Sequence, residues 1–183
     1  MIWTLYNIKN LTEKEYFNWY QTMSTAKKAR VNQFLNVKDR MQTIIGDHIA
    51  RQLIAEWCKI KPEDIRFSIN EHGKPYAVDL PIHFNISHSD NYVFCAVSER
   101  PIGVDIETIR PVDLRIAKKF CSDNELCYIA NDTHRFFEVW TAKEAWAKKI
   151  GRGITAMKDI PYLQIKDRLH FIQTKDYILT IAT

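Results

Sequence analysis

"PIGVDIE", residues 101–107, places two carboxylates in a stretch that otherwise has the composition of a buried β-strand. Side chains alternate between the two faces of a strand, so Asp105 and Glu107 share one face while Val104 and Ile106 occupy the other. Two acids on a partly buried face repel each other unless a cation lies between them. Their spacing alone fits either a strand rim that faces water or a site for Mg²⁺, which usually binds one or two carboxylates.

Short strands and longer helices are expected on both sides of this stretch. The patterns predict strands at 82–89 and 92–98, a hairpin around the turn "NEHGKP", and two or three strands in 163–183. Helices are expected near 12–23, 38–59, 114–121 and 133–150, with capping boxes at Thr12/Glu15 and Ser122/Glu125. Each half of the chain, 1–100 and 101–183, would then hold helices and an antiparallel sheet. The acidic strand would lie near the seam between the halves, where sites tend to form.

The composition narrows the class of protein. Of the 183 residues, 46% are hydrophobic and 26% are charged, as in an ordinary folded protein without a membrane span. The first residues lack the pattern of a signal peptide, and the four cysteines form no C-x-x-C pair, so we expect reduced thiols in a cytoplasmic protein. The net charge of +4 suits an acidic or phosphate-rich partner. Because the lysines are dispersed, a nucleic-acid-binding module is disfavoured.

The helix expected at 133–150 places charges on an apolar face. Lys143 falls at the centre of a stripe that includes Val139 and Trp146, and its simplest explanation is a side chain that snorkels to water. Glu144 and Lys148 could form a surface ion pair worth about 0.3–0.5 kcal/mol. That explanation leaves Lys143 unaccounted for. Two lysines and a third carboxylate beside a possible metal site favour the binding of a phosphate group.

Four motifs in a fixed order make a family resemblance visible: "HGKP" (72–75), "FNISHS" (84–89), "PIGVDIE" (101–107) and "WTAKEAWAKKIGRG" (140–153). Together they resemble the Sfp-type 4′-phosphopantetheinyl transferases, from about residue 24 to the last strand. The resemblance implies an α+β fold of two similar α/β halves with antiparallel sheets, related by a pseudo-twofold axis. It also implies an enzyme that binds coenzyme A and Mg²⁺ in the cleft between the halves. Such an enzyme transfers phosphopantetheine to a serine of an apo acyl or peptidyl carrier protein and releases adenosine 3′,5′-bisphosphate.

The resemblance also assigns roles by position. Asp105, Glu107 and Glu144 would hold Mg²⁺, and Glu144 would deprotonate the acceptor serine directly or through water. Lys148 and Ser87 would contact the pyrophosphate, which makes Glu144, Lys148 and Asp105 the expected catalytic residues. The remaining residues expected to bind coenzyme A are Lys143 at the pyrophosphate, Lys27, Arg30 and His88 at the 3′-phosphate, and Gly73, Lys74 and Pro75 at the adenine.

At two positions, 42 and 125, the family resemblance does not assign a clear role. Similar enzymes usually carry an arginine just before "TIIGD", where this chain has Gln42, so its grip on the 3′-phosphate is expected to differ. Glu125 matches a family position near a metal-bound water, although its capping box already explains it.

Two-half relatives are usually monomers, and we expect the same here. The rival hypothesis is a catalytically silent protein that binds coenzyme A or a nucleotide.

Overall fold

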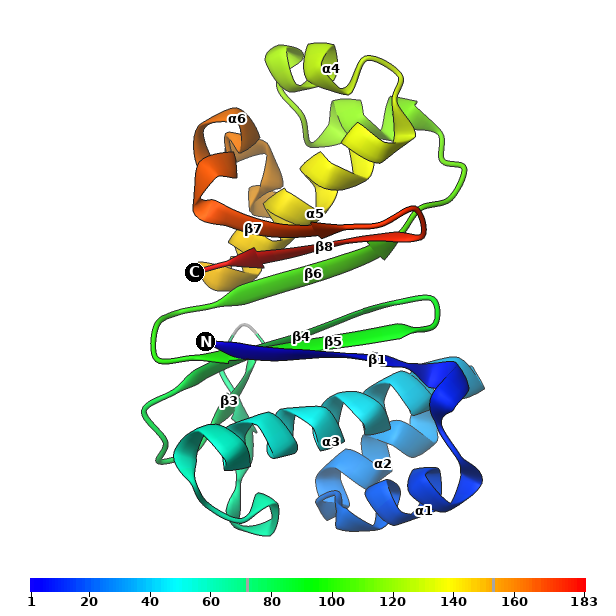
Figure 1. The fold of residues 1–183 in the computed structure, drawn as a ribbon, viewed down its shortest axis with the longest axis vertical. Coiled ribbons are helices and arrows are strands. Elements are labelled where there is room, and N and C mark those ends of the chain that lie inside the picture. The colour runs from blue at the N-terminus through cyan, green and yellow to red at the C-terminus, as the bar shows by residue number, and fades with distance from the viewer. Residues whose placement is uncertain (72, 153) are drawn as a thin grey trace.

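Two three-stranded antiparallel sheets form the centre of the molecule, and a long helix covers the outer face of each (Figure 1). The N-terminal sheet has the order β1–β5–β4 and packs against α3, whereas the C-terminal sheet has the order β6–β8–β7 and packs against α5. This computed structural model describes residues 1–71, 73–152 and 154–183, so His72 of "HGKP" and Gly153 of the last motif lie outside it. The expected α+β fold of two similar halves is confirmed.

The strands agree closely with the sequence prediction. Those of the two main sheets are β1 (Ile2–Asn7), β4 (His83–Ser89), β5 (Tyr92–Ser98), β6 (Gly103–Thr108), β7 (Leu169–Gln173) and β8 (Tyr177–Ala182). The predicted hairpin is also present, as a separate pair of short antiparallel strands, β2 (Phe67–Ile69) and β3 (Pro75–Ala77).

The α-helices α1 to α5 begin where a side-chain cap accepts a free backbone N–H group. Both predicted capping boxes are formed, Thr12 with Glu15 and Ser122 with Glu125. The last long helix ends at Lys149, two residues before Gly151, which has a φ of +71° that favours glycine. The α-helices are α1 (Glu13–Thr22), α2 (Thr25–Gln33), α3 (Val37–Cys58), α4 (Asp123–Ile129), α5 (Thr133–Lys149) and α6 (Tyr162–Ile165). The 3₁₀ helices are η1 (Ile8–Asn10), η2 (Pro62–Asp64), η3 (Leu114–Lys119), η4 (Ile154–Asp159) and η5 (Lys166–Arg168).

Two segments differ from the prediction. The helix expected at 114–121 is the 3₁₀ helix η3, which begins where the Asp113 side chain accepts the Arg115 N–H. Residues 163–168, the first part of the stretch expected to hold two or three strands, belong to α6 and to the 3₁₀ helix η5. Pro161 precedes this helix, and the N–H of Tyr162 donates to the Glu125 carboxylate of a distant helix. A tertiary contact therefore decides the conformation there.

Strands β4 and β6 run side by side at the seam, and polar side chains connect them. Alternate residues of β4 point toward β6, as the period of a strand requires. The bonded pairs are the Asn85 amide oxygen with the Val104 N–H, the Ser87 hydroxyl with Asp105, and the Ser89 hydroxyl with Glu107. These bonds replace a backbone ladder between the two sheets.

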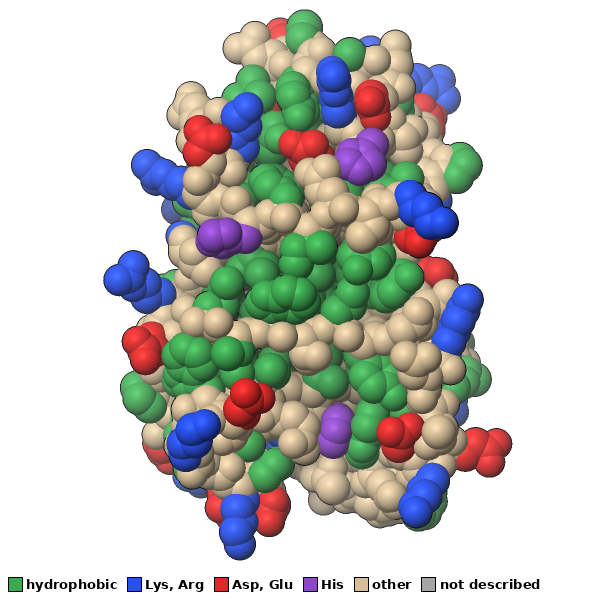
Figure 2. All heavy atoms as spheres, in the orientation of Figure 1, with side chains coloured by type: hydrophobic (Ala, Val, Ile, Leu, Met, Phe, Trp, Pro, Cys, Tyr) green, Lys and Arg blue, Asp and Glu red, His purple; other side chains and the backbone are tan. Residues whose placement is uncertain are grey.

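An apolar cluster fills the space between the same two sheets. Its buried members come from β5, β6 and β8 and from the turn before β6, with Phe94, Ile102 and Leu179 among them. Figure 2 shows a band of hydrophobic side chains across the middle of the viewed face, where the two halves meet. The seam therefore has an apolar interior and a polar line along β4 and β6. Among the helices of the described residues, none has both the length and the hydropathy of a transmembrane span.

Candidate active site

Asp105 lies at the centre of the polar seam, because β6 carries its side chain against β4. The residue is 4% exposed, and its Oδ1 accepts hydrogen bonds from the Ser87 hydroxyl at 2.7 Å and from Lys148 Nζ at 2.6 Å. Lys148 Nζ also donates to Ser87 Oγ at 3.1 Å. The structure thus brings together three predicted site residues from β4, β6 and α5.

A close approach of helix and strand places Lys148 there. Gly103, at the start of β6, lies directly against the backbone of α5, so that a Cβ atom built on it would be 2.0 Å from the Ala145 carbonyl oxygen and 2.3 Å from Lys149 N. No side chain larger than hydrogen fits in that space without movement of backbone atoms. Glycine at position 103 therefore allows the last turn of α5 to reach Asp105.

The other two carboxylates share the electrostatic environment of Asp105. Glu144 is 8% exposed; burial, followed by the negative charge of Asp105, raises its pKa to about 6. Burial also raises the pKa of Asp105, against the opposing effect of Lys148. Glu107 is half-buried, and its Oε2 accepts bonds from Ser89 at 2.8 Å and from Arg110 at 2.8 Å. An acid whose pKa is near 6 can accept a proton at neutral pH.

The oxygen donors fit a magnesium ion that is completed by other ligands. Asp105 Oδ2 is buried without a hydrogen-bond partner, and it alone has this status among side-chain nitrogen and oxygen atoms of the described residues. An unpaired buried carboxylate oxygen is costly unless something binds it. Within 1–71, 73–152 and 154–183 no three His, Cys, Asp or Glu side chains form a ready metal cluster. Mg²⁺ needs only one or two carboxylates when substrate phosphates and water complete its shell.

The structure does not bring Lys143, which was predicted to support the pyrophosphate, to this cluster. Its side chain is fully buried, and its ammonium group pairs with the Glu125 carboxylate at 2.8 Å. The same nitrogen donates to the carbonyl oxygens of Phe120 at 2.8 Å and Met157 at 3.1 Å. These partners occupy the ammonium group inside the C-terminal half. They also give Glu125 a structural role beyond its capping box.

The residues predicted at the 3′-phosphate lie on α2 and β4. Lys27 pairs with the buried Asp47 at 3.2 Å, whereas Arg30 is exposed on the last turn of α2. His88 lies on β4, where the desolvation of the packed part of its ring, followed by the charge of Lys148, lowers its pKa. Gln42 is buried, and its amide donates to the Asp90 carbonyl at 3.0 Å. In the described part of the chain, neither Lys27 nor Arg30 bonds to the Asp105 cluster.

Two of the three residues predicted at the adenine, Lys74 and Pro75, line a pocket at the other end of the seam. Gly73 has a φ of +78° in the hairpin turn and precedes Lys74 and Pro75, which line a cavity of about 270 Å³. Residues of both halves form its walls, among them Tyr76, Phe84, Pro101 and Ile150. The ammonium group of Lys74, a residue predicted at the adenine, donates to backbone carbonyls of the C-terminal half.

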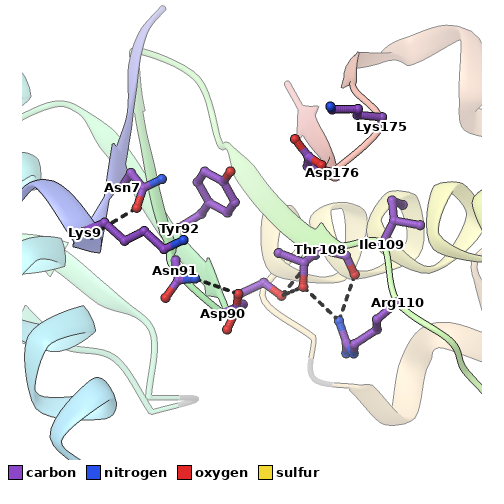
Figure 3. Close-up of a pocket in the computed structure, with 11 residues that line it drawn as sticks. Asn7, Lys9, Asp90, Asn91, Tyr92, Thr108, Ile109, Arg110, Lys175 and Asp176 are labelled. Atoms are coloured by element: carbon purple, nitrogen blue, oxygen red, sulfur yellow. Dashed lines mark hydrogen bonds between the residues drawn. The ribbon is translucent and has the colours of Figure 1, made fainter.

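A second cavity, of about 720 Å³, opens where β4 and β6 end and β5 begins (Figure 3). Ser89 borders it and also bonds to Glu107, so the cavity adjoins the carboxylates. Figure 3 shows Arg110 bonded to Thr108 at its rim. Sequence reasoning assigned no role to this cavity, to Asn85 or to Arg110. The alternation of Asn85, Ser87 and Ser89 in "FNISHS" was a signal that could have indicated the whole polar edge.

A serine hydroxyl, a lysine and coupled carboxylates in a seam between two similar halves are suited to binding and moving a phosphate-linked group. Fold and site together are those expected of an enzyme that transfers a phosphate-linked group. Comparisons with known proteins identify the family. The family model described as "4'-phosphopantetheinyl transferase superfamily" matches residues 101–179, and the model described as "4'-phosphopantetheinyl transferase, N-terminal" matches residues 10–100.

Curated relatives give the same result. The 4'-phosphopantetheinyl transferase gsp of Aneurinibacillus migulanus is 38% identical over 153 residues, which is 80% of this chain and 64% of the relative. The 4'-phosphopantetheinyl transferase Sfp of Bacillus subtilis (strain 168) is 36% identical over 175 residues, which is 92% of this chain and 76% of the relative. The chain thus spans about two thirds of the first relative and three quarters of the second. It belongs to the 4′-phosphopantetheinyl transferase superfamily.

Proposed function

We propose that the cleft transfers the 4′-phosphopantetheine arm of coenzyme A to a serine of an apo acyl or peptidyl carrier protein and releases adenosine 3′,5′-bisphosphate. The observation that carries this proposal is the state of Asp105. One of its oxygens is bound by Lys148 and Ser87, and the other is buried and free. The site therefore offers a cation, a hydroxyl donor and an open anionic ligand at one point, as a metal–pyrophosphate complex requires.

The carboxylates would hold Mg²⁺ through Asp105 Oδ2 and Glu144, with Glu107 as the third proposed ligand. The ion would neutralise pyrophosphate charge and stabilise the charge that develops on the departing bisphosphate. The half-buried position of Glu107 and its bond to Ser89 place its carboxylate at the end of the cleft nearer the 720 Å³ cavity.

The protein side chains would perform the remaining steps. Lys148 and Ser87 would turn from each other toward the pyrophosphate oxygens, which exchanges existing hydrogen bonds for charge-assisted ones. The serine oxygen of the carrier would attack the phosphorus that bears pantetheine, and the bond from that phosphorus to the bridging oxygen would break. Glu144 would accept the serine proton, directly or through a water molecule. The bridging oxygen would leave with adenosine 3′,5′-bisphosphate.

The donor would extend along the seam between the halves 1–100 and 101–183. Its adenine would occupy the 270 Å³ pocket beside Gly73, Lys74 and Pro75, where the lining comes from both halves. Its 3′-phosphate would lie toward Lys27, Arg30 and His88 on α2 and β4. Because one chain supplies both halves of the cleft, we propose that the protein acts as a monomer. Its free cysteines fit a cytoplasmic location, where thiols stay reduced.

The test is intact-mass analysis of apo carrier proteins incubated with this protein, coenzyme A and Mg²⁺. We expect carrier proteins to gain one phosphopantetheine. Asp105→Ala and Glu144→Gln should abolish most of the transfer, while the matched control Glu99→Gln, at an exposed acid, should retain it. Transfer by the wild type but equally by both site variants would refute this active site. Binding of coenzyme A without modification of any carrier, where a known transferase modifies the same samples, would indicate a silent binding protein instead.

A calorimetric Mg²⁺ titration in the presence of coenzyme A, repeated with Glu107→Gln, would decide between two and three carboxylate ligands.

A further inference from the structure

The side chain of Lys74 crosses the seam at the end away from Glu107. Lys74 follows the turn of the β2–β3 hairpin in the N-terminal half, and its Nζ donates to the Ile102 carbonyl at 2.9 Å and to the Lys148 carbonyl at 2.7 Å. Both acceptors belong to the C-terminal half. Ile102 directly precedes β6, and Lys148 is in the last turn of α5. One ammonium group therefore ties a hairpin, a strand and a helix together.

The Lys148 carbonyl is a natural acceptor for a cation. The last carbonyls of an α-helix have no partner within the helix and form the negative end of its dipole. Lys74 satisfies one of them from outside. The contact has an electrostatic cost, because burial lowers the pKa of Lys74 and the charge of Lys148 lowers it further. Two cations are held close together here by specific bonds.

Lys148 is bonded at both ends. Its backbone oxygen accepts from Lys74, while its side-chain Nζ donates to Asp105 Oδ1 at 2.6 Å and to Ser87 Oγ at 3.1 Å. The other acceptor, Ile102, lies directly before β6 and three residues before Asp105. The elements joined by Lys74 are therefore the two elements whose side chains form the Lys148–Asp105 pair.

We infer that Lys74 is a positioning residue for the transfer site: it fixes the last turn of α5 against the start of β6 and so holds Lys148 at Asp105 and Ser87. This inference rests on the proposed function for its effect on turnover. It is separate from contact with the adenine, because the Lys74 ammonium is bonded to protein carbonyls. Geometric errors of about 1 Å at a reacting centre can reduce a rate about 100-fold.

The experiment combines Lys74→Met with Lys148→Met in a double-mutant cycle. For each variant, kcat at saturating coenzyme A and KM for coenzyme A are measured. If Lys74 acts through Lys148, Lys74→Met should lower kcat about 10- to 100-fold in the wild type but change it less than about threefold in the Lys148→Met background. Lys74→Arg, which keeps a cationic donor, should recover part of kcat. The matched control Lys61→Met, at an exposed lysine, should leave kcat unchanged. Independent losses in the two backgrounds, or a rise in KM alone, would overturn the inference.

A second readout does not depend on activity. Hydrogen exchange should become faster in Lys74→Met than in Lys61→Met at the backbone amides of residues 145–152, where the last turn of α5 loses its tie. Unchanged exchange would also overturn the inference. If exchange responds but no carrier is modified by any form of the protein, the positioning contact stands and the proposed function fails. Thermal unfolding of each variant separates both results from a general loss of folding.

Discussion

Replacing Gly103 by alanine should test the contact between β6 and α5 directly. The added methyl carbon would lie 2.0 Å from the Ala145 carbonyl oxygen, whereas ordinary contact begins at 3.4 Å, so the two would have to separate by about 1.4 Å. The second close atom, Lys149 N at 2.3 Å, also belongs to the backbone, so no side-chain rotation can relieve the overlap. The helix itself must move away from the strand.

Two losses should follow from this displacement. Overpacking typically costs about 1–3 kcal/mol, and backbone atoms on both sides put Gly103→Ala at the upper end of that range. For a chain of this size, about 3 kcal/mol corresponds to a fall in Tm of roughly 6–12 °C. The moving helix also carries Lys148, whose 2.6 Å bond to Asp105 would stretch beyond the hydrogen-bond limit of about 3.2 Å. We expect kcat/KM for transfer to fall about 10- to 100-fold even in the folded fraction.

Gly46→Ala is the matched control for this prediction. It adds the same methyl group within α3, where the nearest atom is the Ile86 Cγ2 methyl at 3.2 Å, part of a side chain that can shift. Alanine also favours a helix over glycine by roughly 0.5–1 kcal/mol, so the net change should be within about 1 kcal/mol. The measurements are thermal unfolding and carrier-modification kinetics on both variants. A Gly103→Ala protein with wild-type Tm and wild-type kinetics would show that α5 does not lie against β6 as described.

Three further predictions follow from single residues. Lys143→Met leaves the Glu125 carboxylate buried without its cation, so it should lower the free energy of unfolding, measured in urea, by about 3–5 kcal/mol. The control Arg66→Ala, at an exposed ion pair, should lower it by at most about 1 kcal/mol. Equal effects of the two substitutions would contradict the buried pair. In metal-free buffer, folded Glu144 keeps its proton up to a pKa of about 6, raised from the ordinary 4.5, so its contribution to stability should decrease as the pH rises from about 4.5 to about 6. Thermal unfolding against pH should show this slope in the wild type and lose it in Glu144→Gln; parallel curves would argue against a raised pKa. Gln42→Arg should lower KM for coenzyme A but not for its 3′-dephospho form, because arginine makes the charge-assisted phosphate contact that an amide cannot make. The measurement is steady-state kinetics with both donors. Equal effects on the two KM values would place position 42 away from the 3′-phosphate.

The fold was predictable wherever a local period or cap determined an element. The alternation in "FNISHS" and "PIGVDIE" matched β4 and β6, and both capping boxes marked real helix starts. The prediction failed at residues 163–165, because the bond between Tyr162 N and Glu125 that fixes this segment depends on packing between distant parts of the chain.

The candidate site also combines features that local sequence patterns predict with features that depend on contacts between distant segments. The periodicity placed Lys143 on an apolar stripe, but helical spacing does not show that its ammonium group is buried against Glu125, which lies on another helix. Asp105, Ser87 and Lys148 were grouped through a family resemblance, since 18 to 61 residues separate the bonded pairs in the chain. The reach of Lys74 across the seam was missed for the same reason: nothing local in "HGKP" specifies which carbonyls its side chain will find.

The order of strands in the two sheets has a consequence for solubility. At the seam, polar side chains of β4 and the carboxylates of β6 occupy the edges at which the sheets face each other, and so block further pairing. The outer edges belong to β1 and β7, whose sequences "IWTLYN" and "LHFIQ" contain no lysine, arginine, aspartate or glutamate. Uncharged edge strands with open backbone groups are templates for strand addition from another molecule. Self-association at high concentration should therefore begin at these two outer edges, and a lysine substituted for Thr4 on β1 should raise the concentration at which it starts.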